Sequence, residues 1–328
     1  MIQNKPVEFK QEESTRAEDA KLRDASNAGR LSIDEIADRF GLNAEQRLSF
    51  TCIAETFFGE MKEEKPSQLF HYLGGHGGTG KTRVVQAVRF LFECYGKASW
   101  LATGSYTGMA AHLIKGRTLH AWLSLGRGKG KGKGKNTASS ASKPGKSQQS
   151  VEQLKFFLID EVSTLGCAFL ARLVEALKRG RGSTETAGGV HLIFVGDFSQ
   201  FPPVFDCPLY KEPKSLLGAK VDIEYADEGY VLWNQTILPK LKVVFLHKQM
   251  RQDNDEAFLH VLERVRDGVA TQADVDLLST RVLSEDNRHE VKSPQFSDAR
   301  IIVARNETRH QLNAAFIKSF ALERQLPL

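Results

Sequence analysis

A glycine-rich stretch between an apolar segment and a helical one constrains this chain more than any other feature of its sequence. The stretch is GHGGTGKT, residues 75–82, and it fits the pattern G-x-x-x-x-G-K-[ST]. The preceding QLFHYLGG is typical of a short strand, and the following KTRVVQAVRFLFECYG is typical of a helix that ends at Gly96. This order predicts backbone N–H groups that wrap phosphates, although a plain glycine turn has the same composition.

The residues of this loop have distinct expected roles around a nucleoside triphosphate. Lys81 is expected to reach the β- and γ-phosphates, and the Thr82 hydroxyl is expected to ligate Mg²⁺. The other contacts with the phosphates are expected from Gly75, Gly77, Gly78, Thr79 and Gly80.

A pair of carboxylates at the end of an apolar segment is the second signal. In FFLIDEV, Asp160 and Glu161 follow four apolar residues. Beside a phosphate loop, Asp160 can hold the Mg²⁺ shell, and Glu161 can polarise water for attack on the γ-phosphate. The alternative is an ordinary strand exit followed by an acidic residue at a helix start. Together with the glycine loop, the pair predicts hydrolysis of a nucleoside triphosphate.

Other features narrow the class of nucleotide-using protein. A GTPase needs a guanine-reading N-K-x-D, but Asn4-Lys5 is followed by Pro6-Val7. A small-molecule kinase normally lacks the Asp-Glu pair, and the L-S-G-G-Q-type signature of a transporter ATPase is absent. ATP is therefore the expected nucleotide, with the process that uses its energy left open.

Strand and helix patterns alternate through the first two thirds of the chain. After the glycine loop, the strand-like segments are ASWLATG, LKFFLIDEV and VHLIFVGD, and the helical ones between them are SYTGMAAHLI and LGCAFLARLVEALKR. Near-continuous apolar strands that alternate with helices indicate an α/β fold with a parallel sheet flanked by helices on both faces. Near the end, ARIIVARN is expected to form one more strand, followed by a helix over ETRHQLNAAFIKSFALERQ.

The stretch GDFSQFPPV, residues 196–204, follows the last of the apolar strands in that series. If VHLIFVGD lies beside LKFFLIDEV in the sheet, its terminal turn faces the same nucleotide. Gln200 is then placed to hydrogen-bond the γ-phosphate or the attacking water, while Pro202 and Pro203 stiffen the exit. A solvated loop glutamine is the alternative.

Charge and cysteine content limit the remaining possibilities. Residues 126–147 hold one Arg, six Lys and no acidic residue, a charge of +7 against +5 for the whole chain, so the basicity is local. The Gly/Lys/Ser-rich loop 126–150 is expected to be disordered, and it either touches phosphates or stays solvated. Four cysteines lie far apart without a CxxC pair, which favours an intracellular protein with reduced thiols and no zinc. No run of about 18 apolar residues predicts a membrane span.

Four stretches together resemble the PIF-type DNA helicases, superfamily-one enzymes related to RecD. GGHGGTGKT, FFLIDEVS, GDFSQFPPV and MRQD occur in the order and approximate spacing of that family, within a resemblance that spans roughly residues 40–320. The resemblance implies RecA-like domains, ATP and Mg²⁺ as cofactors, and 5′ to 3′ movement on single-stranded or forked DNA. It also implies work in repair, recombination or telomere maintenance, in the nucleus or the mitochondrion. Oligomeric state stays open.

Position by position, the resemblance implies further site residues. LNAEQ is similar to the family's adenine-reading motif, so Gln46 would hold the base, unless it is a helix-surface amide. Arg251 in MRQD would reach the γ-phosphate, unless it is a surface arginine. LATGSYTGMAAHLIKGRTLHAWL is similar to DNA-contacting motifs, and His120 there is alternatively a structural histidine. The residues that would face DNA are Thr103, Gly104, Thr118 and His120.

The domain organisation follows from these assignments. Residues 1–40, poor in large apolar residues, are expected to be a mobile arm, with a short helical pattern at SIDEIADRF. A RecA-like ATPase domain over 41–250 and a helical connector over 251–297 come next, and 298–328 resembles only the first βα unit of a second RecA-like domain. The expectation is a helicase represented by a truncated chain. The alternatives are an ATP-binding relic that unwinds nothing, or a P-loop scaffold that binds a protein partner.

Overall fold

The computed structural model describes residues 31–125, 149–213, 223–250, 255–285 and 299–324. Contacts divide the chain into a larger unit that ends at Arg266 and a smaller one whose described part begins at Asp267. The predicted loop over 126–150 lies almost entirely outside the described residues, as do residues 1–30 of the predicted arm.

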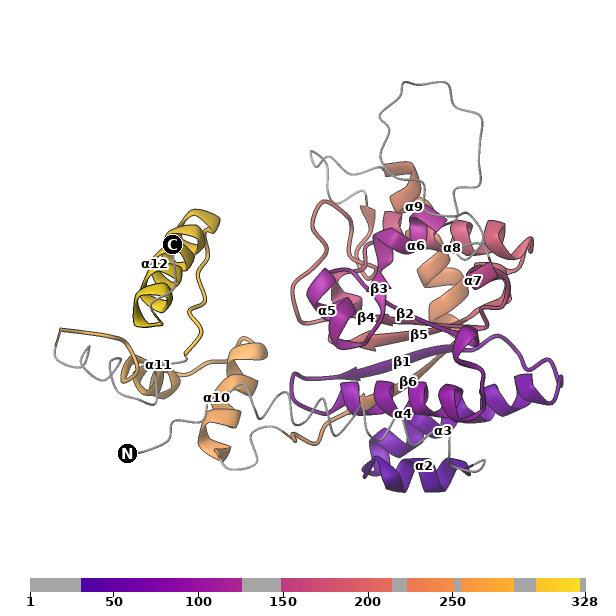
Figure 1. The fold of residues 1–328 in the computed structure, drawn as a ribbon, viewed down its shortest axis with the longest axis horizontal. Helices are drawn as coiled ribbons and strands as arrows, with labels where there is room; N and C mark the ends of the chain where they lie inside the picture. The colour runs from indigo at the N-terminus through magenta and orange to yellow at the C-terminus, as the bar shows by residue number, and fades with distance from the viewer. Residues whose placement is uncertain (1–30, 126–148, 214–222, 251–254, 286–298, 325–328) are drawn as a thin grey trace. The chain divides into compact units, whose positions relative to one another are not determined.

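A six-stranded parallel sheet forms the centre of the larger unit (Figure 1). Its order is β3-β2-β4-β5-β1-β6. The strands are β1 (Phe70–Gly75), β2 (Leu101–Ser105), β3 (Arg117–Thr118), β4 (Phe156–Asp160), β5 (His191–Gly196) and β6 (Leu241–Leu246). The predicted α/β fold with a parallel, helix-flanked sheet is therefore confirmed.

Helices cover both faces of this sheet (Figure 1). One face packs against α2 (Ile33–Arg39), α3 (Ala44–Met61) and α4 (Lys81–Cys94). The other side of the sheet carries α6 (Leu119–Leu125), α7 (Gln149–Glu152), α8 (Cys167–Arg181) and α9 (Ile223–Val231). The short helix α5 (Gly108–Leu113) contacts β2 and β3. Successive residues of one strand serve different faces: Phe156 belongs to the first core and Phe157 to the second.

The strand order decides which loops meet at the carboxyl edge of the sheet. β5 pairs with β4 on one side and with β1 on the other. The turn after β5 therefore lies between the glycine loop that follows β1 and the carboxylate pair that follows β4. This is the arrangement that the sequence predicted for VHLIFVGD beside LKFFLIDEV.

Residues 31–40 depart from the expectation of a mobile arm. Ser32 caps α2, accepting from the Glu35 N–H, and the Glu35 carboxylate accepts from the Ser32 N–H in return. Ile36 and Phe40 on this helix are buried against α3 and α4. A capping box and two large apolar residues fix this part of the predicted arm on the domain.

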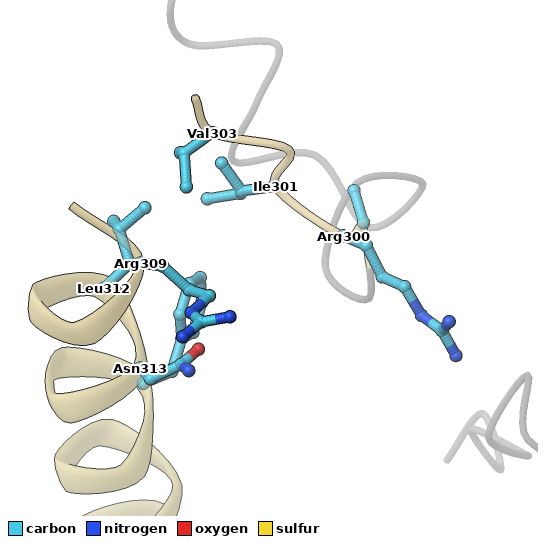
Figure 2. A pocket seen from close by; sticks show the side chains of 8 residues that line it. Arg300, Ile301, Val303, Arg309, Leu312 and Asn313 are labelled. Atoms are coloured by element: carbon cyan, nitrogen blue, oxygen red, sulfur yellow. The ribbon is translucent and has the colours of Figure 1, made fainter. Parts of the chain in front are cut away.

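The chain beyond β6 is mostly helical where it is described. α10 (Glu256–Arg266) ends the larger unit, and α11 (Gln272–Ser279) and α12 (Asn306–Glu323) belong to the smaller one. The strand predicted at ARIIVARN does not form, since residues 299–305 are irregular. Figure 2 shows Ile301 and Val303 turned toward α12, where a hollow of about 380 Å³ remains. The described residues of this unit form no strand beside 299–305. Without a neighbouring strand, the backbone N–H and C=O groups of an extended segment have no partners for the hydrogen bonds of a sheet.

Candidate nucleotide site

The glycine loop after β1 is shaped by two close backbone approaches. Gly75 and Gly80 both have positive φ, at 148° and 86°. A Cβ on Gly75 would meet Thr79 Oγ1 at 2.7 Å, and one on Gly80 would meet Gln46 Nε2 at 2.4 Å. A Cβ on Gly77 would meet nothing within 4 Å. The loop is thus closed by its neighbours at both ends and has room in the middle for a ligand.

Lys81 opens α4 and curls back over the loop. Its Nζ donates to the carbonyls of Gly75 at 2.6 Å and His76 at 2.9 Å. Burial lowers the pKa of Lys81, and the negative charges of Asp197, Asp160 and nearby Glu161 act against that shift. The ammonium is therefore placed among carboxylates at the carboxyl edge of the sheet.

These residues fit the triphosphate and Mg²⁺ that the sequence predicted. Gly80, the N-cap of α4, supplies no side-chain acceptor, so the first N–H groups of the helix point to the loop for an anion to accept. Thr82, in the first turn of α4, is exposed. A hydroxyl and the Asp160 carboxylate are hard oxygen ligands of the kind that Mg²⁺ prefers.

The carboxylate pair lies at the end of β4. Asp160 Oδ1 accepts from the Glu161 N–H at 3.0 Å. Burial and the charge of Glu161 raise the pKa of Asp160 to about 6, while the charge of Lys81 acts against that shift. Glu161 adopts a left-handed conformation with φ of 57°, which is strained for a residue with a side chain. The strand thus ends in a bend at Glu161, where the second carboxylate begins.

The turn after β5, Asp197–Gln200, is called here the Gln200 turn. The Gln200 N–H donates to the Asp197 carbonyl at 3.1 Å, and the Ser199 N–H donates to Asp197 Oδ1 at 3.0 Å. Gly196 has φ of 141°, and a Cβ there would lie 2.9 Å from the Val162 N atom. Glycine therefore lets β5 end directly against the backbone that follows the carboxylate pair, and the Gln200 side chain is exposed.

Gln46 is buried against the glycine loop, at the amino end of α3. The residue is 1% exposed; its Nε2 donates to the Thr79 carbonyl at 3.1 Å, and its Oε1 accepts from the Asn43 N–H at 3.0 Å. It is therefore not a helix-surface amide. Its amide braces the glycine loop from α3, and its expected contact with a base stays a prediction.

Two residues predicted to face DNA are buried in β2. Thr103 is 8% exposed, and its hydroxyl lies 3.5 Å from the Ile114 carbonyl that accepts from it. A Cβ on Gly104 would meet Leu119 at 2.7 Å, inside the core. Their burial argues against direct contact with a nucleic acid strand. Within the same stretch, Thr107 and Gly108 are exposed instead.

The other two residues predicted to face DNA lie nearer the surface. Thr118 Oγ1 accepts from the Ala121 N–H at 3.3 Å at the start of α6. His120 is exposed, and its ring contacts the rings of Tyr106 and Phe169 with centroids 5.1 and 5.0 Å apart. Aromatic side chains thus gather around His120, a grouping that the sequence did not indicate.

Arg251 lies outside the described residues. The residue before it, Met250, donates its N–H to the Gly78 carbonyl at 2.9 Å, so the segment after β6 reaches the glycine loop. The γ-phosphate contact of Arg251 stays a prediction.

Sequence reasoning missed one ion pair at this edge. Asp197 is buried, and both of its carboxylate oxygens accept from Arg266 of α10. No local pattern could have found it, because 69 positions separate the two residues.

Among the residues that the structure describes, no helix has the length and apolar character that crossing a bilayer requires. In the same residues, no group of three or more His, Cys, Asp or Glu side chains is arranged to hold a metal.

Comparison with known proteins agrees with this geometry. Over 211 residues the chain is 32% identical to ATP-dependent DNA helicase RRM3 of Saccharomyces cerevisiae, which covers 63% of this chain and 26% of that protein. Over 254 residues it is 30% identical to ATP-dependent DNA helicase PIF6 of Trypanosoma brucei brucei, covering 75% and 30%. The chain therefore spans less than a third of the length of either relative.

Solved structures show the same fold. Pif1 from Bacteroides sp. in complex with ADP-AlF4 superposes with a TM-score of 0.54 at 23% identity, covering 83% of this chain and 56% of that one. Pif1 from Candida albicans gives a TM-score of 0.50 at 24% identity, covering 71% and 46%. The RecA-like architecture that the resemblance implied is thus confirmed. Residues 41–276 match the family model described as PIF1-like helicase, well over half of the chain, and the chain belongs to that family.

Proposed function

We propose that this chain is the ATP-hydrolysing portion of a DNA helicase that moves 5′ to 3′ on single-stranded DNA and separates duplex strands. One observation carries the proposal. Three adjacent strands, β4, β5 and β1, deliver a carboxylate pair, the Gln200 turn and a phosphate-binding loop to one edge of the sheet. The relatives' names as ATP-dependent DNA helicases support the choice of reaction and of DNA as partner.

The residues divide the work of hydrolysis among them. The N–H groups of the glycine loop and Lys81 Nζ would bind the β- and γ-phosphates. Thr82 and Asp160 would hold Mg²⁺, which when bound neutralises charge on the phosphate oxygens. Glu161 would orient the attacking water and accept its proton at a carboxylate oxygen. Gln200, at the exposed end of its turn, would hydrogen-bond the γ-phosphate or that water.

The proposed DNA contacts lie at the surface of the stretch between β2 and α6. Exposed Thr107 and His120 replace the buried Thr103 and Gly104 in this proposal. Structures of Bacteroides Pif1 bound to single-stranded DNA and of Pif1 helicases at forked DNA support single-stranded or forked DNA as the partner class. By family, the process is repair, recombination or telomere maintenance in the nucleus or mitochondrion.

DNA-stimulated ATP turnover is the test. We expect the chain to hydrolyse ATP faster when oligo(dT) is added. Lys81→Ala is expected to lose nucleotide binding, and Glu161→Gln to bind ATP but lose turnover by at least about a hundredfold. Glu175→Gln makes the same chemical change at a half-exposed position of α8 and is the matched control.

Two outcomes would contradict the proposal. ATP binding without turnover, with or without DNA, would favour the relic. Binding of ATP with capture of a protein partner and no response to DNA would favour the scaffold. Strand separation on a forked substrate with a 5′ tail, but not with a 3′ tail, would support the direction.

A further inference from the structure

The ion pair between Asp197 and Arg266 connects α10 to the Gln200 turn. Arg266 Nη2 donates to Asp197 Oδ1 at 2.8 Å, and Nη1 donates to Oδ2, so the guanidinium binds both carboxylate oxygens. The same Nη2 donates to Ser199 Oγ at 3.1 Å. Arg266 thus contacts two residues of the turn through a planar, two-pronged geometry that lysine cannot reproduce.

The Asp197 carboxylate is shared between the helix and the turn itself. Its side chain is 3% exposed, and its Oδ1 also accepts from the Ser199 N–H. Burial alone would raise the pKa of Asp197, but the hydrogen bonds from Arg266 and the Ser199 N–H, with the Arg266 charge, lower it overall. Removing Arg266 would leave a buried carboxylate without its principal donor, at the position that shapes the turn.

Arg266 also lies close to the phosphate loop. Together with His76 and Gly77 it lines a hollow of about 290 Å³ between that loop and α10. Its positive charge acts on Lys81, the residue expected to bind the β- and γ-phosphates. The guanidinium therefore stands at the phosphate end of the site, although it comes from a helix outside the sheet.

We propose that Arg266 is a positioning residue of the ATPase site: through Asp197 it fixes the turn that presents Gln200, and so includes α10 in the hydrolysis machinery. This inference rests on the proposed ATPase function. Arg266 is the last residue of the larger unit, and the chain passes directly from it into the smaller one. A movement of α10 would therefore shift the position of Gln200.

Steady-state kinetics test the catalytic part of the inference. Arg266→Ala is expected to lower kcat for ATP about tenfold to a hundredfold and to change KM less than about threefold, because a displaced Gln200 affects chemistry more than binding. Gln200→Ala is expected to lower kcat as well, and the double variant to be no slower than the slower single variant. Arg266→Lys keeps the charge but loses the two-pronged hydrogen bonding, so its kcat should lie between those of the wild type and Arg266→Ala.

Hydrogen exchange tests the structural part without needing any activity. In Arg266→Ala the amides of Ser199 and Gln200 are expected to exchange about tenfold faster, with α4 unchanged. Arg264→Ala removes the same kind of side chain from the same helix and is expected to leave exchange and kcat unchanged. If Arg266→Ala does not fold, Arg266→Lys and Arg266→Gln carry the same comparisons.

The outcomes separate this inference from the proposed function. Faster exchange in the turn, lower kcat and non-additivity with Gln200→Ala support it. Unchanged exchange, unchanged kcat or additive effects overturn it. If the wild-type chain shows no ATP turnover, the proposed function fails, and exchange alone decides whether Arg266 fixes the turn.

Discussion

Gly80 illustrates how a single missing side chain shapes the nucleotide site. Its φ of 86° is unfavourable for any other residue, and Gln46 Nε2 occupies the place of a Cβ. We expect Gly80→Ala to lower the free energy of unfolding by about 1–3 kcal/mol, from backbone strain and a displaced Gln46. Urea denaturation without nucleotide measures this. Gly77→Ala, in open space in the same loop, should change it by less than about 0.5 kcal/mol; equal losses in both variants would contradict the explanation.

His71 is a buried base on β1. Its Nε2 lies 2.8 Å from Ser49 Oγ, and its Nδ1 has no hydrogen-bond partner among the described residues. Burial, helped by the positive charge of Lys242, lowers the pKa of His71 to about 4. The unfolded chain therefore binds a proton between pH 6.5 and 4 that the folded chain does not, and stability falls as the pH drops through that window.

The resulting pH dependence can be measured directly. We expect the free energy of unfolding to drop by about 2 kcal/mol between pH 7 and pH 5 because of His71. His71→Gln, which keeps a hydrogen-bonding side chain near Ser49 but cannot titrate, should lose correspondingly less stability over the same range. Urea melts at both pH values compare the two proteins, and parallel pH slopes would show that His71 does not titrate as described.

At the scale of elements, the start of α8 depends on a distant loop. Gly166, its N-cap, has no side chain to accept from the helix. The Asp206 carboxylate accepts these hydrogen bonds instead, from the Ala168 N–H at 3.1 Å and the Phe169 N–H at 2.9 Å. A Cβ on Gly166 would lie 2.2 Å from Asp206, so the glycine makes room for the cap.

This cap predicts a stability effect far from the chemistry. We expect Asp206→Ala to lower the free energy of unfolding by about 1–2 kcal/mol, because two helix N–H groups lose their acceptor. Asp206→Asn keeps one acceptor oxygen and should recover at least about half of that loss. Urea denaturation of the two variants decides; an Asp206→Ala protein as stable as wild type would mean that water replaces the cap.

Two strands show where sequence patterns fail. β6 was not predicted, because Lys242 interrupts its apolar run. It is the edge strand beside β1 and is partly exposed. The segment 299–305 was predicted as a strand from its apolar residues and is irregular. Strand formation depends on a neighbour, and the residues of one segment do not encode it.

At the scale of the whole molecule, burial separates residues that the sequence grouped as one DNA surface. We expect His120→Ala to weaken binding of labelled oligo(dT) about fivefold to a hundredfold, through the loss of a ring available to bases. Thr103→Ala should change thermal stability and leave oligo(dT) affinity within about twofold. Fluorescence anisotropy and thermal melts give both readouts. A larger affinity loss for Thr103→Ala than for His120→Ala would show that Thr103 contacts DNA, as the sequence predicted.

The smaller unit carries apolar side chains at its surface. Phe316, Ile317 and Phe320 of α12 are about half exposed or more, and Ile302 is 96% exposed. Figure 2 shows a few side chains from residues 300–303 and α12 around the open hollow. The described part of this unit therefore buries little of its apolar surface within itself.

The sequence by itself determined the phosphate loop, the carboxylate pair and the turn that bears Gln200, because each is a short run of residues whose backbone preferences and side chains act locally. It also indicated the parallel sheet, since buried strands alternate with helices. Tertiary structure alone decided the contacts between distant segments: Gln46 with Thr79, Asp206 with the start of α8, and Arg266 with Asp197. The Cys167 N–H likewise donates to the Cys207 carbonyl at 2.8 Å, although 40 positions separate the two cysteines. Such contacts follow from the order of the strands and the packing of the helices. No short stretch of residues shows which distant residue it will contact.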